Sequence, residues 1–480
     1  MTEELWRKDA HELARLIRSR EISAVEVIEA HLHRIEEVNP ALNAVVDTLR
    51  DRALDEARAA DERTAAGESH LGALHGVPVT IKENVDVAGT ATTHGIPALA
   101  HAIASHDAPA VERLRAAGAI VLGRTNLPDM ALRIHTDSSL RGLTRNPWHP
   151  GRTAGGSSGG EAAALASGMT PLGIGNDIGG SLRNPAHCCG VSAVKPTQGR
   201  VPHATVIEPE DGPLSLQMMQ TNGVMARRVA DLSLGLGVIA GAHHRDPGSV
   251  PVPLKAPGQP PTASRVALLA EPPGGTTDAG IATIVRQAGE HLESAGYVVD
   301  ELSPPDYMAA IELWRRFLFT EIRAMQPLLE QVMGDDGRRF LDCALAHEPV
   351  LDLEAYVELF VHRRRVARAW LEFLQTYPII VTPVWSQPAF PHGWDAETPT
   401  QAQAAMELLR PVMPANLLGL PAVTTPAGLM AGMPVGVQCI AAPFREDLAL
   451  STAAVIEAAV GRLTPVDPFV NNTEDVTAPQ

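Results

Sequence analysis

The sequence is poor in aromatic residues, in cysteine and in positive charge, and each deficit disfavours a class of protein. Only 4% of the 480 residues are aromatic. The four cysteines are too few and too scattered for a disulfide framework, so we expect a reduced, cytoplasmic protein. The formal net charge of −17 would repel phosphate backbones, which disfavours nucleic acid as a partner. No run approaches the ~20 apolar residues of a membrane span, and the N-terminal segment lacks the apolar core of a signal peptide. Neither a membrane nor a nucleic acid is therefore an expected partner.

What the sequence does contain is a regular alternation of helix and strand patterns. Residues 23–40 carry apolar side chains at helical spacing, and Ser23 with Glu26 forms a capping box. Pro40 is expected to end this helix. Later segments extend the alternation: a short Ala-rich helix at 161–168, a strand at 169–177, an irregular proline-rich connection at 246–262, a strand at 264–273, helices at 279–297 and 306–333, a strand at 377–385 and two closing strands within 416–443.

A buried strand is predicted in the first part of the chain. The β-branched run over 77–81 has a turn on each side and is followed directly by Lys82, with a second short run at 85–87. A helix predicted over 109–117 and a strand over 119–122 come next. Strand, helix and strand in this order favour a largely parallel sheet.

Glycine and serine are concentrated in a loop at 154–160 and in a turn at 177–181. Gly151 and Gly156 have the spacing of a phosphate-binding loop, but Ser157 stands where the lysine of such a loop belongs. Nucleotide binding is therefore disfavoured. Glycine permits sharp turns and close approach of the backbone to a ligand, and serine supplies a helix cap or a nucleophile.

Histidine and cysteine suggest two further sites, and both are weak. His187, Cys188 and Cys189 are consecutive, so their side chains cannot easily converge on one tetrahedral ion, and buried core cysteines are the better interpretation. We expect no metal. The chain has 18 histidines from which a Ser-His-Asp triad could draw its base, but Ser181 does not lie in a G-x-S-x-G elbow.

Lys82, Ser157 and Ser181 form the remaining candidate constellation. A lysine can act as a base when burial lowers its pKa, and an apolar strand leads directly into Lys82. The alternative is that Lys82 extends to the surface or pairs with Glu83. These residues alone leave the two interpretations open.

A resemblance to a known family favours the first interpretation. The segments "GGSSGG" and "DIGGSLRNPA" closely resemble the signature of the amidase signature family of serine hydrolases, and "HGVPVTIKENVDVAGTATTHG" resembles its lysine motif. Further similar segments, from "GRTNLPDMA" to "NLLGLPAVTTPAG", extend the resemblance over most of the chain, and the separations between the three candidate residues agree with the family. Residues 203–395 show little that matches, apart from "NGVMARRVADLSL" and the late strand, and we expect substrate choice to reside there.

The resemblance implies a role for each matching residue. Ser181 would be the nucleophile, Lys82 the base, and Ser157, preceded by a cis peptide, the serine that relays the proton between them. Asp177 and Arg183 would brace the turn. The oxyanion hole would use the N–H groups of Ile178, Gly179, Gly180 and Ser181, and the substrate would contact Met130, Ala131 (through its carbonyl), Gly155 and Gly156.

The resemblance also implies an architecture: one large α/β domain with a mixed central sheet flanked by helices on both faces. We expect residues 1–70 to be a helical segment packed on the core, 71–240 to be the signature core, and 241–480 to hold the variable substrate-pocket region and the closing strands of the same sheet. Met130, Leu132 and Ile134, in a chain with few aromatic residues, predict an acyl pocket that is apolar but poor in aromatic stacking.

The predicted activity is hydrolysis of a C–N bond in a small, mainly apolar linear amide or carbamate, through a Ser181 acyl-enzyme and without a cofactor. The alternatives are a glutaminase-type subunit of a tRNA-dependent amidotransferase and a catalytically silent scaffold on the same fold. The expected partner is the small-molecule substrate, and a homodimer is possible. Burial next to two hydroxyls is expected to lower the pKa of Lys82 by about 2–3 units.

Overall fold

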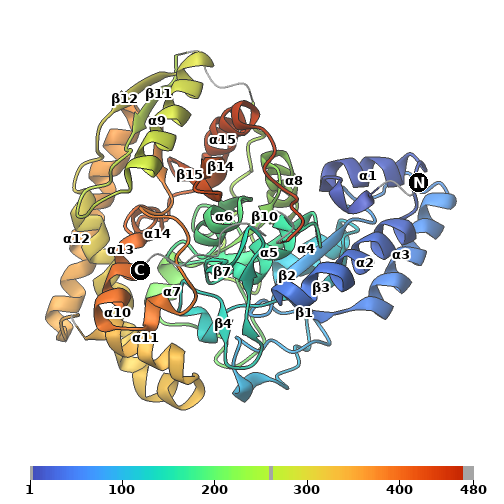
Figure 1. Cartoon of the computed structure of the whole chain (residues 1–480), viewed down its shortest axis with the longest axis horizontal. Helices are drawn as coiled ribbons and strands as arrows, with labels where there is room; N and C mark the ends of the chain where they lie inside the picture. The colour runs from blue at the N-terminus through green and yellow to red at the C-terminus, as the bar shows by residue number, and fades with distance from the viewer. Residues whose placement is uncertain (1–3, 259–262, 347, 469–480) are drawn as a thin grey trace.

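A mixed β-sheet runs through the protein (Figure 1). The computed structural model describes residues 4–258, 263–346 and 348–468. Within these ranges the sheet has eleven strands. In spatial order they are β1 (Val45–Thr48), β3 (Ile120–Thr125), β2 (Pro78–Lys82), β8 (Leu172–Asp177), β10 (Thr221–Ala226), β9 (Ser192–Lys195), β14 (Ala422–Met430), β15 (Met433–Ala441), β13 (Ile379–Pro383), β11 (Arg265–Leu268) and β12 (Val298–Glu301).

The strand pairing confirms the predicted mixed α/β architecture. Strand β2 pairs in parallel with both β3 and β8, and β11 pairs in parallel with β12 and β13. The strands from β8 through β10, β9, β14 and β15 to β13 pair antiparallel. Outside this sheet, the described part of the chain forms small hairpins of β4 (Asp137–Ser138) with β5 (Gly142–Leu143) and of β6 (Arg145–Asn146) with β7 (His149–Thr153).

Helices flank the sheet, with α1–α3 at one end of the molecule and α10–α12 at the other (Figure 1). The helices are α1 (Ala10–Arg18), α2 (Ala24–Leu42), α3 (Arg50–Ala65), α4 (Pro109–Ala116), α5 (Gly159–Ala166), α6 (Arg183–Cys189), α7 (Leu214–Met219), α8 (Val229–Ile239), α9 (Ala279–Ser294), α10 (Tyr307–Val332), α11 (Asp335–Leu345), α12 (Leu353–Thr376), α13 (Pro399–Leu408), α14 (Met413–Leu417) and α15 (Glu446–Val460). Short 3₁₀ turns in the described residues are η1 (Leu5–Arg7), η2 (Pro97–Leu99), η3 (Asp129–Ala131) and η4 (Trp394–Ala396). No helix within the described ranges combines the length and the apolarity needed to cross a bilayer.

The central strands are covered on both faces. Every residue of β2, β3, β8, β9 and β10 is buried. A sheet with parallel strands reaches this state when elements pack on both sides, which explains the continuous apolar runs of the sequence. Polar side chains on these strands are thereby removed from water.

Most predicted elements are confirmed. The buried strand before Lys82 is β2, the following helix and strand are α4 and β3, and the parallel pairing of β2 with β3 agrees with the strand–helix–strand order. The later predicted strands are β8, β11, β13, β14 and β15, and the helices are α5, α9 and α10. The proline-rich segment is irregular as far as residue 258, while 259–262 lie outside the described residues.

Two local predictions were wrong. Pro40 does not end α2, which begins at the predicted capping box and continues to Leu42. Pro40 lies in the last turn, and the helix is capped three residues later at Asn43, whose φ of 55° is left-handed and whose N–H donates to the Asn39 carbonyl. The short run at 85–87 is not a strand, because the Val85 N–H turns back to the Lys82 carbonyl (3.0 Å).

Candidate active site

Strand β2 carries Lys82 into the interior, where its amine contacts two polar side chains. Lys82 is fully buried, and its Nζ donates to Ser157 Oγ (2.7 Å) and to Asn176 Oδ1 (2.7 Å). Glu83 has other partners, since its carboxylate pairs with Arg141 and accepts a hydrogen bond from Thr93 (2.6 Å). The alternative in which Lys82 reaches the surface or pairs with Glu83 was therefore wrong.

Burial makes the Lys82 amine easy to deprotonate. Loss of hydration lowers the pKa of Lys82 to about 7, against the opposing charges of Asp177 and Glu161. The direction of this change in pKa agrees with the sequence prediction. The second hydrogen-bond partner of Lys82 differs from the prediction: it is the amide oxygen of Asn176 and not a second hydroxyl. Burial thus makes the neutral amine of Lys82 accessible at lower pH than for a lysine in water.

Behind Lys82 lies a carboxyl group that the sequence analysis did not select. Glu161, in the first turn of α5, accepts hydrogen bonds from Thr80 and Thr125 on the adjacent strands β2 and β3. Burial raises the pKa of Glu161 to about 7. A Cβ at Gly173 would lie 1.8 Å from Glu161 Oε1, so only glycine leaves room for this carboxyl over β8. The signal in the sequence is an acidic residue within an otherwise small and apolar helix.

The loop before α5 positions Ser157. The Gly156–Ser157 peptide is cis, as the resemblance implies. A Cβ at Gly155 would lie 2.7 Å from the Pro185 Cα, and a Cβ at Gly156 would lie 2.6 Å from the Ile134 carbonyl carbon. The two glycines therefore serve close packing between backbone segments. Their predicted contact with a substrate stays a prediction.

The second turn brings Ser181 to the same place. Ser181 lies between β8 and α6, and 8% of its surface is exposed. Its carbonyl accepts a hydrogen bond from the Ser158 N–H (3.2 Å), which joins the turn to the loop that carries Ser157. Within the described part of the chain, no hydrogen bond links the hydroxyls of Ser157 and Ser181. Lys82 and Ser157 are therefore joined by a direct side-chain hydrogen bond. Ser157 and Ser181 are held near each other by the backbone hydrogen bond between their two loops.

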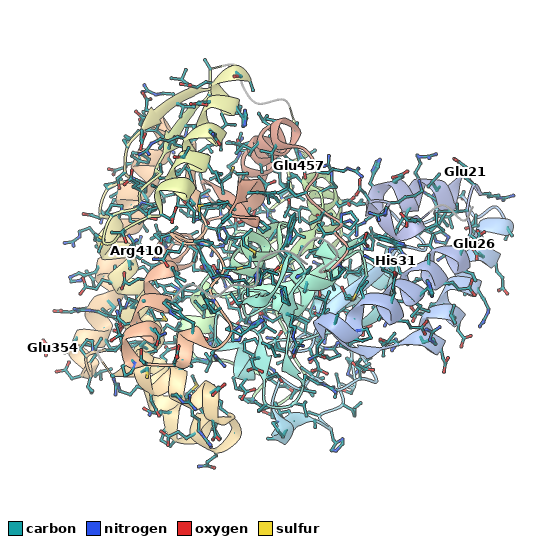
Figure 2. All side chains as sticks on the ribbon, in the orientation of Figure 1. Glu21, Glu26, His31, Glu354, Arg410 and Glu457 are labelled. Atoms are coloured by element: carbon teal, nitrogen blue, oxygen red, sulfur yellow. The ribbon has the colours of Figure 1, made fainter. Side chains whose placement is uncertain are left out.

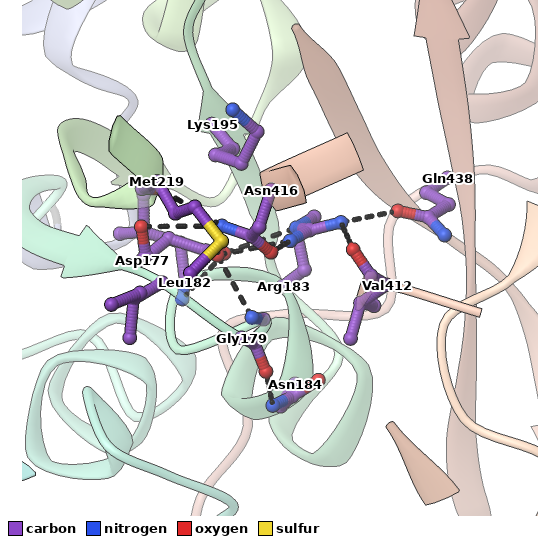
Figure 3. A network of polar contacts seen from close by, with 12 residues as sticks. Asp177, Gly179, Leu182, Arg183, Asn184, Lys195, Met219, Val412, Asn416 and Gln438 are labelled. Carbon is purple, nitrogen blue, oxygen red and sulfur yellow. Dashed lines mark hydrogen bonds and ion pairs between the residues drawn. The ribbon is translucent and has the colours of Figure 1, made fainter. Parts of the chain in front are cut away.

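A buried ion pair holds the Ser181 turn, in agreement with the bracing role predicted for Asp177 and Arg183 (Figure 3). Arg183 donates two hydrogen bonds to Asp177, from Nε (3.0 Å) and from Nη2 (2.9 Å). Burial alone would raise the pKa of Asp177, but the Arg183 guanidinium holds it well below its usual range. The same carboxylate accepts from the backbone N–H groups of Gly180 (2.8 Å) and Leu182 (3.1 Å). One charged group thus fixes the turn on both sides of Ser181.

The brace also reaches residues far along the chain. Arg183 donates to the Val412 carbonyl (3.0 Å), to Gln438 Oε1 (2.8 Å) and to Asn416 Oδ1 (Figure 3). Asn416 in turn donates to Asp177 Oδ1 (2.9 Å). The sequence analysis missed these C-terminal partners, because nothing local marks a buried amide as the partner of a distant arginine.

One of the four N–H groups predicted to form the oxyanion hole has another partner in the structure. The Gly180 N–H is already donated to Asp177, which leaves those of Ile178, Gly179 and Ser181 for the predicted oxyanion hole. The indole of Trp314, from α10, lies against the turn, and its Nε1 donates to the Ile178 carbonyl (2.7 Å). A Cβ at Gly179 would lie 2.6 Å from Trp314 Cζ2, so this position requires glycine. An aromatic ring thus lies beside the turn. That the acyl pocket is apolar and poor in aromatic stacking stays a prediction.

The predicted substrate acceptor lies in a tight turn. Met130 (φ 51°) and Ala131 (φ 60°) both have left-handed backbones. Their N–H groups are used internally, by the carbonyls of His94 (2.8 Å) and Pro128 (2.9 Å). Among the described residues, none donates a hydrogen bond to the Ala131 carbonyl. Its oxygen can therefore accept a hydrogen bond from a substrate amide N–H, as the prediction requires.

The histidine and cysteine cluster is part of the core. His187, Cys188 and Cys189 are fully buried in α6, and His187 Nδ1 accepts from the Gly436 N–H (3.0 Å). Burial raises the pKa of both thiols. Across the described ranges, no three His, Cys, Asp or Glu side chains are grouped so that they could hold a metal ion.

Comparison with known proteins agrees with this geometry. The family model described as Amidase matches residues 26–450. The chain is 42% identical to an indoleacetamide hydrolase of Bradyrhizobium diazoefficiens, over 96% of this chain and 88% of that protein. It is 33% identical to a glutamyl-tRNA(Gln) amidotransferase subunit of Symbiobacterium thermophilum, over 92% of this chain and 95% of that protein.

Solved structures give the same result. A bacterial aryl acylamidase of the amidase signature family superposes with a TM-score of 0.83 at 27% identity, covering 94% of this chain and 96% of the other. A 6-aminohexanoate cyclic dimer hydrolase gives a TM-score of 0.80 at 29% identity, covering 95% and 98%. The sequence match, the shared fold and the lysine–serine geometry lead to one conclusion: this chain belongs to the amidase signature family.

Proposed function

We propose that this protein hydrolyses the C–N bond of small amides through an acyl-enzyme on Ser181. The observation that carries the proposal is the hydrogen bond between Lys82 Nζ and Ser157 Oγ (2.7 Å), in a buried site next to the Ser181 turn. An amine with a pKa of about 7 can accept a proton at neutral pH, which a lysine in water cannot do efficiently.

Acylation follows from this arrangement. Ser181 Oγ attacks the acyl carbon while its proton passes to Ser157, whose own proton passes to Lys82 Nζ. The negative charge on the substrate oxygen is stabilised by the N–H groups of Ile178, Gly179 and Ser181, an effect worth several kcal/mol in a dry site. The C–N bond then breaks, and the proton returns from Lys82 through Ser157 to the leaving nitrogen.

Deacylation repeats the relay with water. Water attacks the ester carbon on Ser181 and gives its proton through Ser157 to Lys82. Collapse of the second tetrahedral intermediate releases the carboxylic acid and returns the proton to Ser181 Oγ. Lysine, serine and serine end in their starting protonation states, so the cycle needs no cofactor.

For the substrate, we propose a primary amide with a small, mainly apolar acyl group that carries an aryl ring, of which indole-3-acetamide is an example. Two indoleacetamide hydrolases support this class, at 42% and 39% identity over 96% and 78% of this chain. The Trp314 indole beside the turn gives the site an aromatic neighbour. Small carbamates present a similar acyl centre and form the second substrate class to be tested.

A panel assay tests the proposal. Release of ammonia and acid is measured with indole-3-acetamide, phenylacetamide, a simple carbamate and glutamine, using the wild type and Ser181→Ala. We expect the aryl amides to be the best substrates, Ser181→Ala to be inactive, and a fluorophosphonate to label only the wild type. Preference for glutamine would favour the amidotransferase alternative. Absence of both labelling and turnover would favour the silent scaffold.

A further inference from the structure

Helix α12 presents a line of apolar side chains to solvent. Leu353, Val357 and Val361 recur at every fourth residue and are 78%, 53% and 68% exposed. The opposite face of the helix is buried against the protein through Leu359, Val366, Trp370 and Leu374. Single exposed apolar residues are common on soluble proteins, whereas an aligned row on one helix is a candidate for an interaction surface. In Figure 1, α12 lies at the outer edge of the molecule.

Between residues 354 and 368, the charges on the exposed side of α12 are separated along the helix. Glu354 and Glu358 come first, and Arg364, Arg365 and Arg368 follow; Glu372, which is also exposed, lies beyond this stretch. Within the described part of the chain, none of these five side chains forms an ion pair, although ion pairs are frequent elsewhere on the surface. Glu354 extends from the edge of the molecule (Figure 2).

The helix dipole does not account for this order. It favours acidic residues in the first turn and basic residues in the last, and its effect fades within one turn. Glu354 lies in the first turn, but no basic residue lies in the last, and Glu358 and Arg364 are near the middle of the helix. A partner with the opposite order of charge would explain the pattern, and a second copy of the same helix, reversed, has that order.

We propose that two copies of this chain pair through α12, antiparallel, about a two-fold axis at Val361. In this register Val361 faces Val361 of the second copy, Glu358 faces its Arg364, and Glu354 faces its Arg368. Two-fold symmetry makes each charge pair twice. The steps from Leu353 to Val357, Val361, Arg364 and Arg368 are four, four, three and four residues, which keeps these side chains along one face of the helix. A parallel arrangement would place like charges together.

A lipid surface fits the same face less well. The two glutamates would lie next to the apolar row, and a chain with a net charge of −17 is repelled by anionic headgroups. The helix has 24 residues and is therefore ~36 Å long, enough for an extended helix-to-helix contact. In the proposed register a second copy pairs both glutamates with arginines and covers Val361 with its own Val361, while Val357 and Leu353 lie opposite its Arg365 and Ala369.

Charge-reversal variants test the pairing. Glu354→Arg with Glu358→Arg makes both members of each proposed charge pair basic, and Arg364→Glu with Arg368→Glu makes both members acidic. By sedimentation or light scattering, we expect the wild type at micromolar concentration to have twice the chain mass of 51.0 kDa. Each variant alone should associate at least ~100-fold more weakly, because like charges then face each other. An equimolar mixture of the two variants should restore the dimer.

The matched control is Glu29→Arg with Glu290→Arg, which makes the same change of charge at exposed positions of α2 and α9. It should remain dimeric, and amide hydrolysis or circular dichroism shows that all variants are folded. A monomeric wild type would overturn the proposal, as would variants that dimerise alone or fail to associate when mixed. Binding of a monomeric wild type to neutral lipid vesicles would assign the face to a membrane surface instead.

Discussion

The pH dependence of catalysis is the most direct consequence of the Lys82 environment. Lys82 with a pKa of about 7 is roughly one tenth deprotonated at pH 6 and roughly nine tenths deprotonated at pH 8. If Lys82 is the base, kcat/KM should rise about tenfold over this interval and then level off. A lysine with its ordinary pKa near ~10.4 would give a rise of about 100-fold with no plateau.

The assay measures kcat/KM for the best amide of the panel from about pH 5.5 to 9.5, at constant ionic strength, in wild type, Lys82→Ala and Lys82→Arg. Both variants should lose about 10³-fold or more, because alanine removes the base and guanidinium stays protonated. Neither should show an inflection near pH 7. His94 is not expected to mimic this inflection, because burial lowers its pKa to about 4.

Two other buried groups could give an inflection near pH 7, and each has its own control. Lys195 also has a pKa lowered by burial to about 7, but its Nζ donates to the Pro196 carbonyl (2.8 Å), so Lys195→Met should keep the inflection. Glu161 also titrates at about 7, and its charge raises the pKa of Lys82. Glu161→Gln should therefore keep the inflection and move it to lower pH. Loss of the inflection in either control, or its survival in an active Lys82→Ala, would refute the assignment of the base.

Three further substitutions test the rest of the site. Ser181→Ala should lower kcat about 10³-fold or more while the melting temperature stays within a few degrees, and turnover within tenfold of wild type would exclude Ser181 as the nucleophile. Ser157→Ala should lower kcat at least ~100-fold, whereas Ser158→Ala should have a small effect, since the Ser158 Oγ has no hydrogen-bond partner among the described residues. Gly179→Ala should lower kcat at least tenfold by forcing the turn away from Trp314 Cζ2, which would be 2.6 Å from the new Cβ; unchanged kinetics would show that the turn can move freely.

The parts of the site that sequence predicted are local. An apolar run followed by a lysine is enough to indicate that Lys82 ends a buried strand, and β2 confirms it. The glycines around Ser157 and Ser181 indicate sharp turns, and the structure has them. In each case the signal and its consequence lie within a few residues, so periodicity and turn chemistry suffice.

The parts that were missed depend on contacts between distant segments. Trp314 reaches the Ser181 turn from α10, in the region where the sequence resembles its family least. Asn176 was overlooked next to the more conspicuous Asp177, although alternation along β8 sends the two side chains to opposite faces. The role of Gly180 was misjudged because the sequence cannot show which acceptor its N–H meets. Only the folded arrangement assigns these partners.

The Asn416 side chain provides a test of whether the catalytic turn depends on the C-terminal part of the chain. Asn416 is fully buried, donates to Asp177 Oδ1 (2.9 Å) and accepts from Arg183, and hydrogen bonds to charged groups contribute ~1.5–3 kcal/mol each. We expect Asn416→Ala to lower the free energy of unfolding in urea by about 3 kcal/mol and to lower kcat as well, because Asp177 then holds the turn less firmly. Gln287→Ala, on the exposed side of α9, should change stability by less than about 0.5 kcal/mol. If Asn416→Ala costs less than about 1 kcal/mol and leaves kcat unchanged, residues 71–240 position Ser181 without help from the closing segment, and the interdependence inferred from the Arg183 contacts is wrong.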